Sequence, residues 1–304
     1  MAFGDKSLQR RDKSLQRGDM SLQRRDMSLQ RGDMSLQRGD KSLQRGDMSL
    51  QRGDKSLLRR DKNIQRGDKG ADVVELQLKL NGFRGTVWDG DFGPGSELQV
   101  MAFQREVMKT TSPSGVFDAN SFDALHEFEI NNPIDFASIR CPCGQCDGFG
   151  QGRFKNKYRA DKPKVEAYHR REYPGIHKAI LYAFRAVCFH LKNHDFPMPI
   201  LTSGYRCWIH NEMKGRRSTN HMGKAIDIDF PAQPTEFKRD DAERCDRARS
   251  LLVDKAGFQI GWHGNNRKAL EPASIAPTWL HMDVRCYSQK YLADTFFVTD
   301  ESQL

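Results

Sequence analysis

The sequence lacks any run of about 18 apolar residues, the minimum for a membrane-spanning helix, so we expect no transmembrane segment. Residues 1–6 also lack the apolar stretch of a secretory signal peptide. We therefore expect the protein to be made in a cytoplasm without export through a signal peptide. Thiols stay reduced there, so the seven cysteines favour metal binding over disulfides.

Apolar residues are also scarce, at 37% of the chain, which indicates that part of it buries little surface. Residues 4–66 are nine tandem heptads, from GDKSLQR at the start to RDKNIQR at the end. Each heptad has one constant aliphatic position, which is too few for the two-position seam of a coiled coil. We predict a flexible arm over residues 1–64.

The positive charge of the chain is concentrated in this arm. The heptads carry a net charge of +8 out of the formal +9, so the rest of the chain is nearly neutral. Such an arm can be attracted to anionic envelope surfaces, or it can be a solvated spacer without a partner. We expect no specific binding to nucleic acid.

Three helices are predicted after the arm. Apolar residues recur at helical spacing within residues 67–82 and 96–108, and a third loop-and-helix unit follows from residue 114 to 125. Gly82 after Asn81 is a typical helix stop, and Ser96 can cap the second helix.

Three motifs in this region occur in a characteristic order. They are Gly67-Asp-x-Gly70, Asp89-Gly-Asp-Phe-Gly-Pro94 and Gly115-Val-Phe-Asp118. Together they resemble the three-helix peptidoglycan-binding domain of many cell-wall hydrolases. The resemblance implies an all-α domain over residues 65–128 with bacterial peptidoglycan as its partner.

The second half of the chain mixes helical and strand patterns. Residues 129–172 are predicted to be a linker with a cysteine cluster, part of which joins the following domain. Pro174 is predicted to open an amphipathic helix that ends near Asn193. We expect an α+β domain over residues 173–304 with a small antiparallel sheet, and its candidate strands are residues 199–206, 225–230, 258–262 and 279–284.

Histidine and carboxylate residues in this domain suggest a catalytic zinc site, which needs three protein ligands and one open position. The candidates are His221, Asp227 and His281.

Three separated motifs around these candidates resemble zinc peptidases. The family includes D-alanyl-D-alanine carboxypeptidases and phage L-alanyl-D-glutamate endopeptidases. The resemblance implies that His221, Asp227 and His281 hold zinc and that Arg206 binds a substrate carboxylate or the developing oxyanion. The motifs are Ser203-Gly-Tyr-Arg206, Ser218-x-x-His221-x-Gly-Lys-Ala-Ile-Asp227 and Trp279-x-His281-x-Asp283-x-Arg285.

The sequence departs from the family pattern at the first ligand. The usual histidine lies seven residues before the aspartate, where this chain has Asn220, and His221 lies only six residues before Asp227. Either the loop is one residue shorter or Asp229 replaces Asp227. We favour Asp227, because the Gly-Lys-Ala-Ile-Asp motif that ends at this residue is intact.

A second departure concerns the general base. Many relatives have an acidic residue three positions before the last histidine, where this chain has Thr278, which cannot accept a proton at neutral pH. Asp283 is the preferred substitute, although it could equally orient His281. Glu271 and His263 are the other candidates.

The cysteine cluster has its own open alternatives. Cys141, Cys143 and Cys146 could supply three thiolates of a structural zinc site, closed by Cys207, Cys286 or a histidine. Inert packing or redox chemistry are the other interpretations.

The two resemblances together predict a modular phage endolysin, a monomer that is made in the host cytoplasm and reaches the wall after the membrane is permeabilised. The alternatives are a host wall-remodelling D,D-carboxypeptidase and a non-catalytic wall-binding virion protein.

Overall fold

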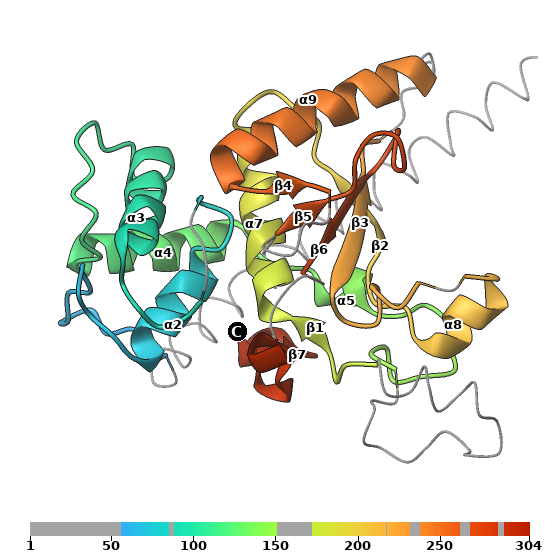
Figure 1. The fold of residues 1–304 in the computed structure, drawn as a ribbon, viewed down its shortest axis with the longest axis horizontal. Helices are drawn as coiled ribbons and strands as arrows, with labels where there is room; N and C mark the ends of the chain where they lie inside the picture. Colours follow the sequence, from blue (N-terminus) through green and yellow to red (C-terminus); the bar gives the residue numbers. More distant parts are fainter. Residues whose placement is uncertain are drawn as a thin grey trace, which may run out of the picture. The chain divides into compact units, whose positions relative to one another are not determined.

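The computed structural model describes residues 56–84, 88–150, 172–216, 218–231, 238–261, 268–284 and 289–304. Ser56–Leu304 form one compact unit (Figure 1). Most of the predicted arm, together with His263 and Cys286, lies outside the described residues. None of the helices described here is long and apolar enough to cross a membrane.

A five-stranded sheet lies at the centre of the second half of the chain. Its strand order is β2-β3-β6-β5-β4, with β2 at Ile200–Ser203, β3 at Ala225–Asp229, β6 at Leu280–Asp283, β5 at Ala269–Leu270 and β4 at Gln259–Ile260. Neighbouring strands are antiparallel except β4 and β5, which are parallel. The central sheet is therefore mixed rather than wholly antiparallel, because its β4–β5 edge is parallel.

A second, two-stranded antiparallel sheet pairs β1 (Ile176–His177) with β7 (Phe297–Val298). The sequence predicted that a helix starts at Pro174, but helix α7 begins only at Lys178 and ends at Lys192. The start was misjudged because Ile176 and His177 are held in strand pairing by a segment more than a hundred residues away. His177 then caps the helix, since its Nδ1 accepts a hydrogen bond from Ala179 N at 3.1 Å.

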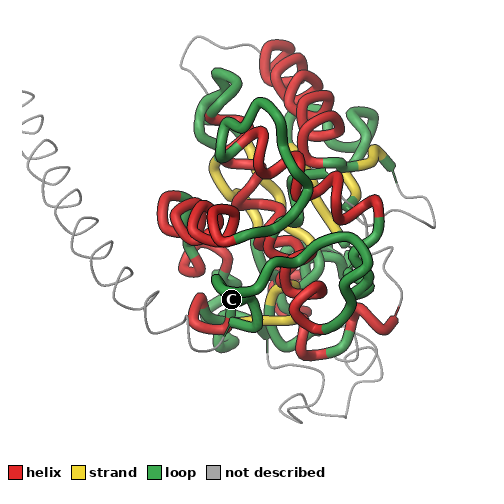
Figure 2. Tube along the Cα trace, turned by 90° about the vertical axis from the view of Figure 1, so that its left-hand side faces the viewer, coloured by secondary structure: helices red, strands yellow, loops and turns green. Residues whose placement is uncertain are grey.

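Helices α7 and α9 (Lys238–Ala256) pack against one face of the central sheet (Figure 1). Ile226 and Ile228 of β3 lie in the same buried cluster as Val187 of α7 and Leu252 of α9. Because side chains alternate along a strand, the residues between these isoleucines point to the opposite face. Figure 2 shows the strands in the middle of the described unit, with helices on several sides of them.

The three helices predicted before residue 129 are present as α2 (Ala71–Lys79), α3 (Pro94–Glu106) and α4 (Ala119–Asn131). Helix α2 contacts α7, and just after α2 the Asn81 Nδ2 donates to Ala179 O at 2.7 Å. Gly82 lies so close to α7 that an added Cβ would be 2.5 Å from Ala186 Cβ. The boundaries at residues 128 and 172, and a separate three-helix domain, stay predictions.

The last heptad belongs to this packed unit. Ile64 is 1% exposed, and it exchanges two backbone hydrogen bonds of 2.9 Å with Phe117. Leu58 of the preceding heptad is 3% exposed. The arm predicted over residues 1–64 is therefore packed at its C-terminal end, where the heptad aliphatic residue finds a partner.

The stability of the fold should be sensitive to acid because of two buried histidines, one in α7 and one that caps it. Burial lowers the pKa of both His177 and His190 to about 4. Between about pH 6.5 and pH 4 the unfolded chain binds more protons than the folded chain, so stability falls as the pH falls. We expect each histidine to remove up to about 3 kcal/mol of unfolding free energy across this window.

Urea unfolding of His177→Gln at pH 7 and pH 4.5 should show a smaller pH dependence than the parent protein. His126→Gln, the same substitution at a half-buried histidine of α4, is the matched control. An equal slope for all three proteins would contradict the prediction.

Candidate metal centre

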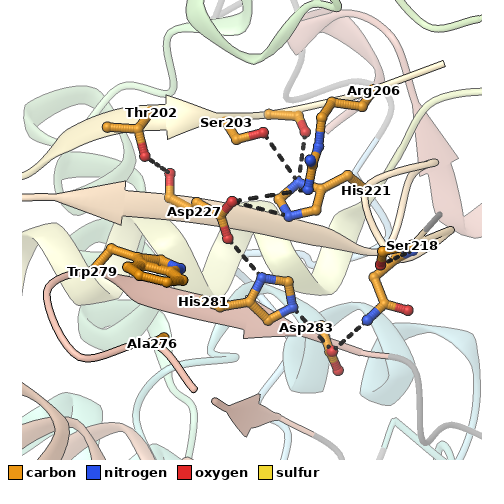
Figure 3. Close-up of polar contacts among 12 residues, drawn as sticks. Thr202, Ser203, Arg206, Ser218, His221, Asp227, Ala276, Trp279, His281 and Asp283 are labelled. Atoms are coloured by element: carbon orange, nitrogen blue, oxygen red, sulfur yellow. Dashed lines mark hydrogen bonds and ion pairs between the residues drawn. The ribbon is translucent and has the colours of Figure 1, made fainter. Parts of the chain in front are cut away.

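The centre is built on the face of the sheet opposite α7 and α9. Asp227 of β3 lies directly across from His281 of β6 in the antiparallel register. Opposed residues of antiparallel strands place their side chains on the same face, so these two meet without any special loop. His281 Nδ1 lies 2.6 Å from Asp227 Oδ1 (Figure 3).

His221 approaches the same carboxylate from the turn before β3. Its Nδ1 lies 3.0 Å from the carbonyl O of Gly204, so Nδ1 carries the ring hydrogen and donates it. Nε2 therefore presents a lone pair, and it lies 3.2 Å from Asp227 Oδ2 (Figure 3). Among the described residues this buried Nε2 has no hydrogen-bond partner.

The turn between His221 and Asp227 depends on a glycine. Gly223 has a φ of 116°, and a Cβ there would lie 2.5 Å from Gly175 O. The N–H of His177 donates to Gly223 O at 2.9 Å, which ties this turn to β1. The close backbone approach aims His221 into the centre.

The donor set fits a zinc ion. One ligand atom each from His221, Asp227 and His281 lie within 4.8 Å of one another, and all three residues are largely buried. Ligands about 2.1 Å from zinc at tetrahedral angles lie about 3.4 Å apart, close to the 3.2 Å between His221 Nε2 and Asp227 Oδ2. A cation between these facing lone pairs would resolve their repulsion.

The charges around His281 attract a cation. Burial alone would lower the pKa of His281, but its hydrogen bonds with Asp227 and Asp283 outweigh this and raise it to about 9. Burial alone would raise the pKa of Asp227, but its hydrogen bond with His281 holds it well below its usual range. Burial lowers the pKa of His221, so that ring is neutral and available as a ligand.

Asp283 and Asn220 support the centre from the far side of His281. Asp283 Oδ2 lies 3.3 Å from His281 Nε2, and Asn220 Nδ2 donates to the same oxygen at 3.3 Å. A carboxylate on the second nitrogen of a metal-binding histidine fixes the orientation of its ring. Asn220 thus lies next to a carboxylate and outside the ligand group, so the centre is built with the six-residue spacing from His221 to Asp227.

The two aspartates of β3 differ in their relation to the ligand group. Asp229 points to the same face as Asp227, but it lies outside the three-residue group, and its Oδ1 accepts a hydrogen bond from Phe230 N at 2.8 Å. The alternative ligand set with Asp229 is therefore not brought together here.

Arg206 borders the centre and has unused donors. Its backbone N–H donates to His221 O at 2.8 Å, and the Nη2 of its side chain lies 4.0 Å from Asp227 Oδ2. The side chain is buried, and Nε and Nη1 have no hydrogen-bond partner among the described residues. Burial lowers the pKa of Arg206 to about 10, so it remains charged at neutral pH. Buried donors of this kind call for an anionic partner.

A row of polar residues crosses the sheet beside the ligands, and the sequence analysis did not predict it. Ser203 of β2 is in register with Asp227 of β3, which is opposite His281 of β6. The N–H of Glu271 donates to His281 O at 3.0 Å, which extends the pairing of β5 by one residue. Glu271 is thus the cross-strand neighbour of His281, whereas Thr278 lies in the segment that leads into β6.

Comparison with protein families and with curated proteins finds no match to this chain.

Isosteric changes of the two aspartates test the ligand set. Asp227→Asn should remove one bound zinc ion per chain, because it removes the central negative charge. The zinc affinity should fall by more than the roughly 10- to 100-fold that is typical when a residue hydrogen-bonded to a ligand is changed. Asp229→Asn, on the same face of the same strand, should keep that zinc. The measurement is zinc content by plasma mass spectrometry after dialysis, and the reverse pattern would assign the ligand to Asp229.

Proposed function

We propose that this protein is a zinc-dependent peptidase that hydrolyses amide bonds in the stem peptides or cross-links of bacterial peptidoglycan, as a phage endolysin does. The observation that carries the proposal is the meeting of His221, Asp227 and His281 in one buried group beside Arg206. The order of the three sequence motifs around these residues supports it.

His221 through Nε2, Asp227 through its carboxylate and His281 through Nδ1 would hold the zinc. Two imidazoles and one carboxylate leave one position open, as in catalytic rather than structural sites. When bound, zinc lowers the pKa of a coordinated water to about 7 and polarises a substrate carbonyl.

Arg206 is proposed to bind the substrate. Its planar group of donors suits a carboxylate in bidentate fashion, and stem peptides carry free carboxylates. Its unused Nε and Nη1 provide the hydrogen bonds that such a carboxylate needs. The contact with Asp227 at 4.0 Å is too long to occupy the side chain fully.

Two acidic residues compete for the proton-transfer role. Asp283 was preferred from the sequence, but its contact with His281 Nε2 favours a positioning role, in which it keeps Nδ1 aimed at the metal. Glu271 is the cross-strand neighbour of His281 and is half-buried, so it becomes the preferred candidate for the proton acceptor.

The remaining parts are assigned by resemblance. Residues 65–128 are proposed to bind peptidoglycan and hold the enzyme on its polymeric substrate, and the basic arm adds attraction to anionic envelope surfaces. We propose a monomer that lyses the host from within once the membrane has been permeabilised.

Matched amide substitutions separate the two acidic candidates. A general base that is lost should lower kcat by roughly 100- to 10,000-fold while zinc stays bound. A positioning residue that is lost should instead lower zinc affinity by roughly 10- to 100-fold, with activity recovering in excess zinc. We expect Asp283→Asn to show the second pattern and Glu271→Gln the first. A kcat loss in Asp283→Asn that zinc does not rescue would make Asp283 the base.

Digestion of purified peptidoglycan tests the function as a whole. The protein should release fragments with new peptide termini, identified by mass spectrometry, and His281→Ala should release none. New amines at L-Ala-D-Glu bonds would identify an endopeptidase, and release of terminal D-Ala a carboxypeptidase.

New reducing sugar ends would contradict the peptidase proposal. Wall binding without cleavage by the zinc-loaded protein would identify a non-catalytic binder instead.

A further inference from the structure

Four cysteines outside the histidine and aspartate centre converge in the structure. Cys141, Cys143 and Cys146 lie after the short helix α5 (Phe136–Ile139), and Cys207 caps helix α8 (Trp208–Met213). All four are free thiols, and their Sγ atoms lie within 4.8 Å of one another. Cys207 Sγ lies 3.7 Å from Cys141 Sγ and 3.6 Å from Cys143 Sγ, and Cys143 Sγ lies 3.6 Å from Cys146 Sγ.

These separations match the edges of a metal tetrahedron. Four sulfurs about 2.3 Å from zinc at tetrahedral angles lie about 3.8 Å apart. Inert packing would require neither this convergence nor four donors of one kind. Soft thiolate ligands in a set of four select zinc or iron.

The backbone around the sulfurs is shaped to stabilise thiolates. Three N–H groups are directed at sulfur: Gln145 N lies 3.3 Å from Cys143 Sγ, His210 N lies 3.3 Å from Cys207 Sγ, and Cys207 N lies 3.5 Å from Cys141 Sγ. Such donors partly neutralise the charge that four thiolates bring together.

A short backbone hydrogen bond joins the two ends of the loop that carries three of the cysteines. Cys141 N donates to Gly148 O at 2.6 Å, and Gly144 between the second and third cysteine has a φ of 69°, a left-handed conformation that suits glycine. The ring of His210 lies next to Cys141, with Nδ1 3.6 Å from Sγ, and remains outside the four-sulfur group.

We propose that Cys141, Cys143, Cys146 and Cys207 bind one zinc ion in a closed tetrathiolate site that is separate from the histidine and aspartate centre. The site joins two segments that are 66 residues apart. It is a structural site, because all four positions are filled by protein and none is open to substrate.

The proposed site also fixes the position of Arg206. Cys207 is the next residue in the chain, and Tyr205 N donates to Ile139 O at 2.7 Å just before the cysteine loop. At Gly204 an added Cβ would lie 2.3 Å from that same carbonyl oxygen, so the two segments are in tight contact. A metal at Cys207 would therefore anchor the segment that presents the guanidinium to the substrate.

Metal counting on the full-length chain tests the proposal. After purification in a reductant, the protein should contain two zinc ions per chain, and His281→Ala should contain one. The double variant Cys143→Ser, Cys146→Ser should also contain one. Cys188→Ser is the matched control, because Cys188 lies on α7 outside the four-sulfur group, and it should keep both.

A second measurement needs no cysteine variant. A mercurial that modifies thiols should release one zinc from the parent protein and one from His281→Ala. Cobalt-substituted His281→Ala should show strong thiolate-to-cobalt charge-transfer absorption in the near ultraviolet.

The two proposals fail in different ways. If His281→Ala binds no metal, or if iron rather than zinc fills the thiolate site, the tetrathiolate zinc proposal is overturned. If the parent protein binds one zinc that mercurials release and His281→Ala retains, the thiolate site stands and the proposed catalytic centre falls.

Discussion

The mutual repulsion of ligand atoms in a buried place is the constraint on which the centre depends. A neutral His221 turns the lone pair of Nε2 toward Asp227 Oδ2 at 3.2 Å, and neither atom has a hydrogen to share. Removing such groups from water is costly unless a cation lies among them. The ring of His281 lies between Asp227 and Asp283, and these two hydrogen bonds raise the pKa of His281 to about 9 despite burial.

The rest of the fold stabilises this arrangement because one face of the central sheet is apolar and the other is polar. Ile226 and Ile228 pack with α7 and α9, and this apolar burial stabilises β3 in its register. A slip of one residue would turn Asp227 into that core, so the register that buries the isoleucines is the one that places the aspartate opposite His281. The packing of one face thus determines the chemistry of the other.

Part of this could be predicted from the sequence because it depends on local patterns. The alternation in residues 225–230 predicted β3, and the spacing of His281 and Asp283 predicted that both lie on one face of a strand. The convergence of His221, Asp227 and His281 was expected from motif resemblance, and the structure brings the three together. The turn at Gly223 places His221 rather than Asn220 in the centre. The shape of this turn depends on backbone contacts with Gly175.

The rest depended on pairings between distant segments. Nothing near Ile176 in the chain indicates that Phe297 and Val298 will pair with β1 and delay the start of α7. The parallel pairing of β4 and β5 and the position of Glu271 beside His281 likewise follow only once strand neighbours are known. In each case the local sequence is compatible with more than one structure, and tertiary contacts select among them.

Arg206 shows how the two candidate metal sites relate to each other. The sequence places Cys207 directly after it, and the structure places Cys207 among four sulfurs while Arg206 faces the carboxylate of Asp227. A buried guanidinium with unused donors would gain by rotating toward any nearby acceptor, so something must hold its backbone. The Arg206 N–H bond to His221 O and the sulfur group at the next residue restrain it from both sides. Two adjacent residues thus connect the four-sulfur group with the histidine and aspartate group, while their side chains face different sites.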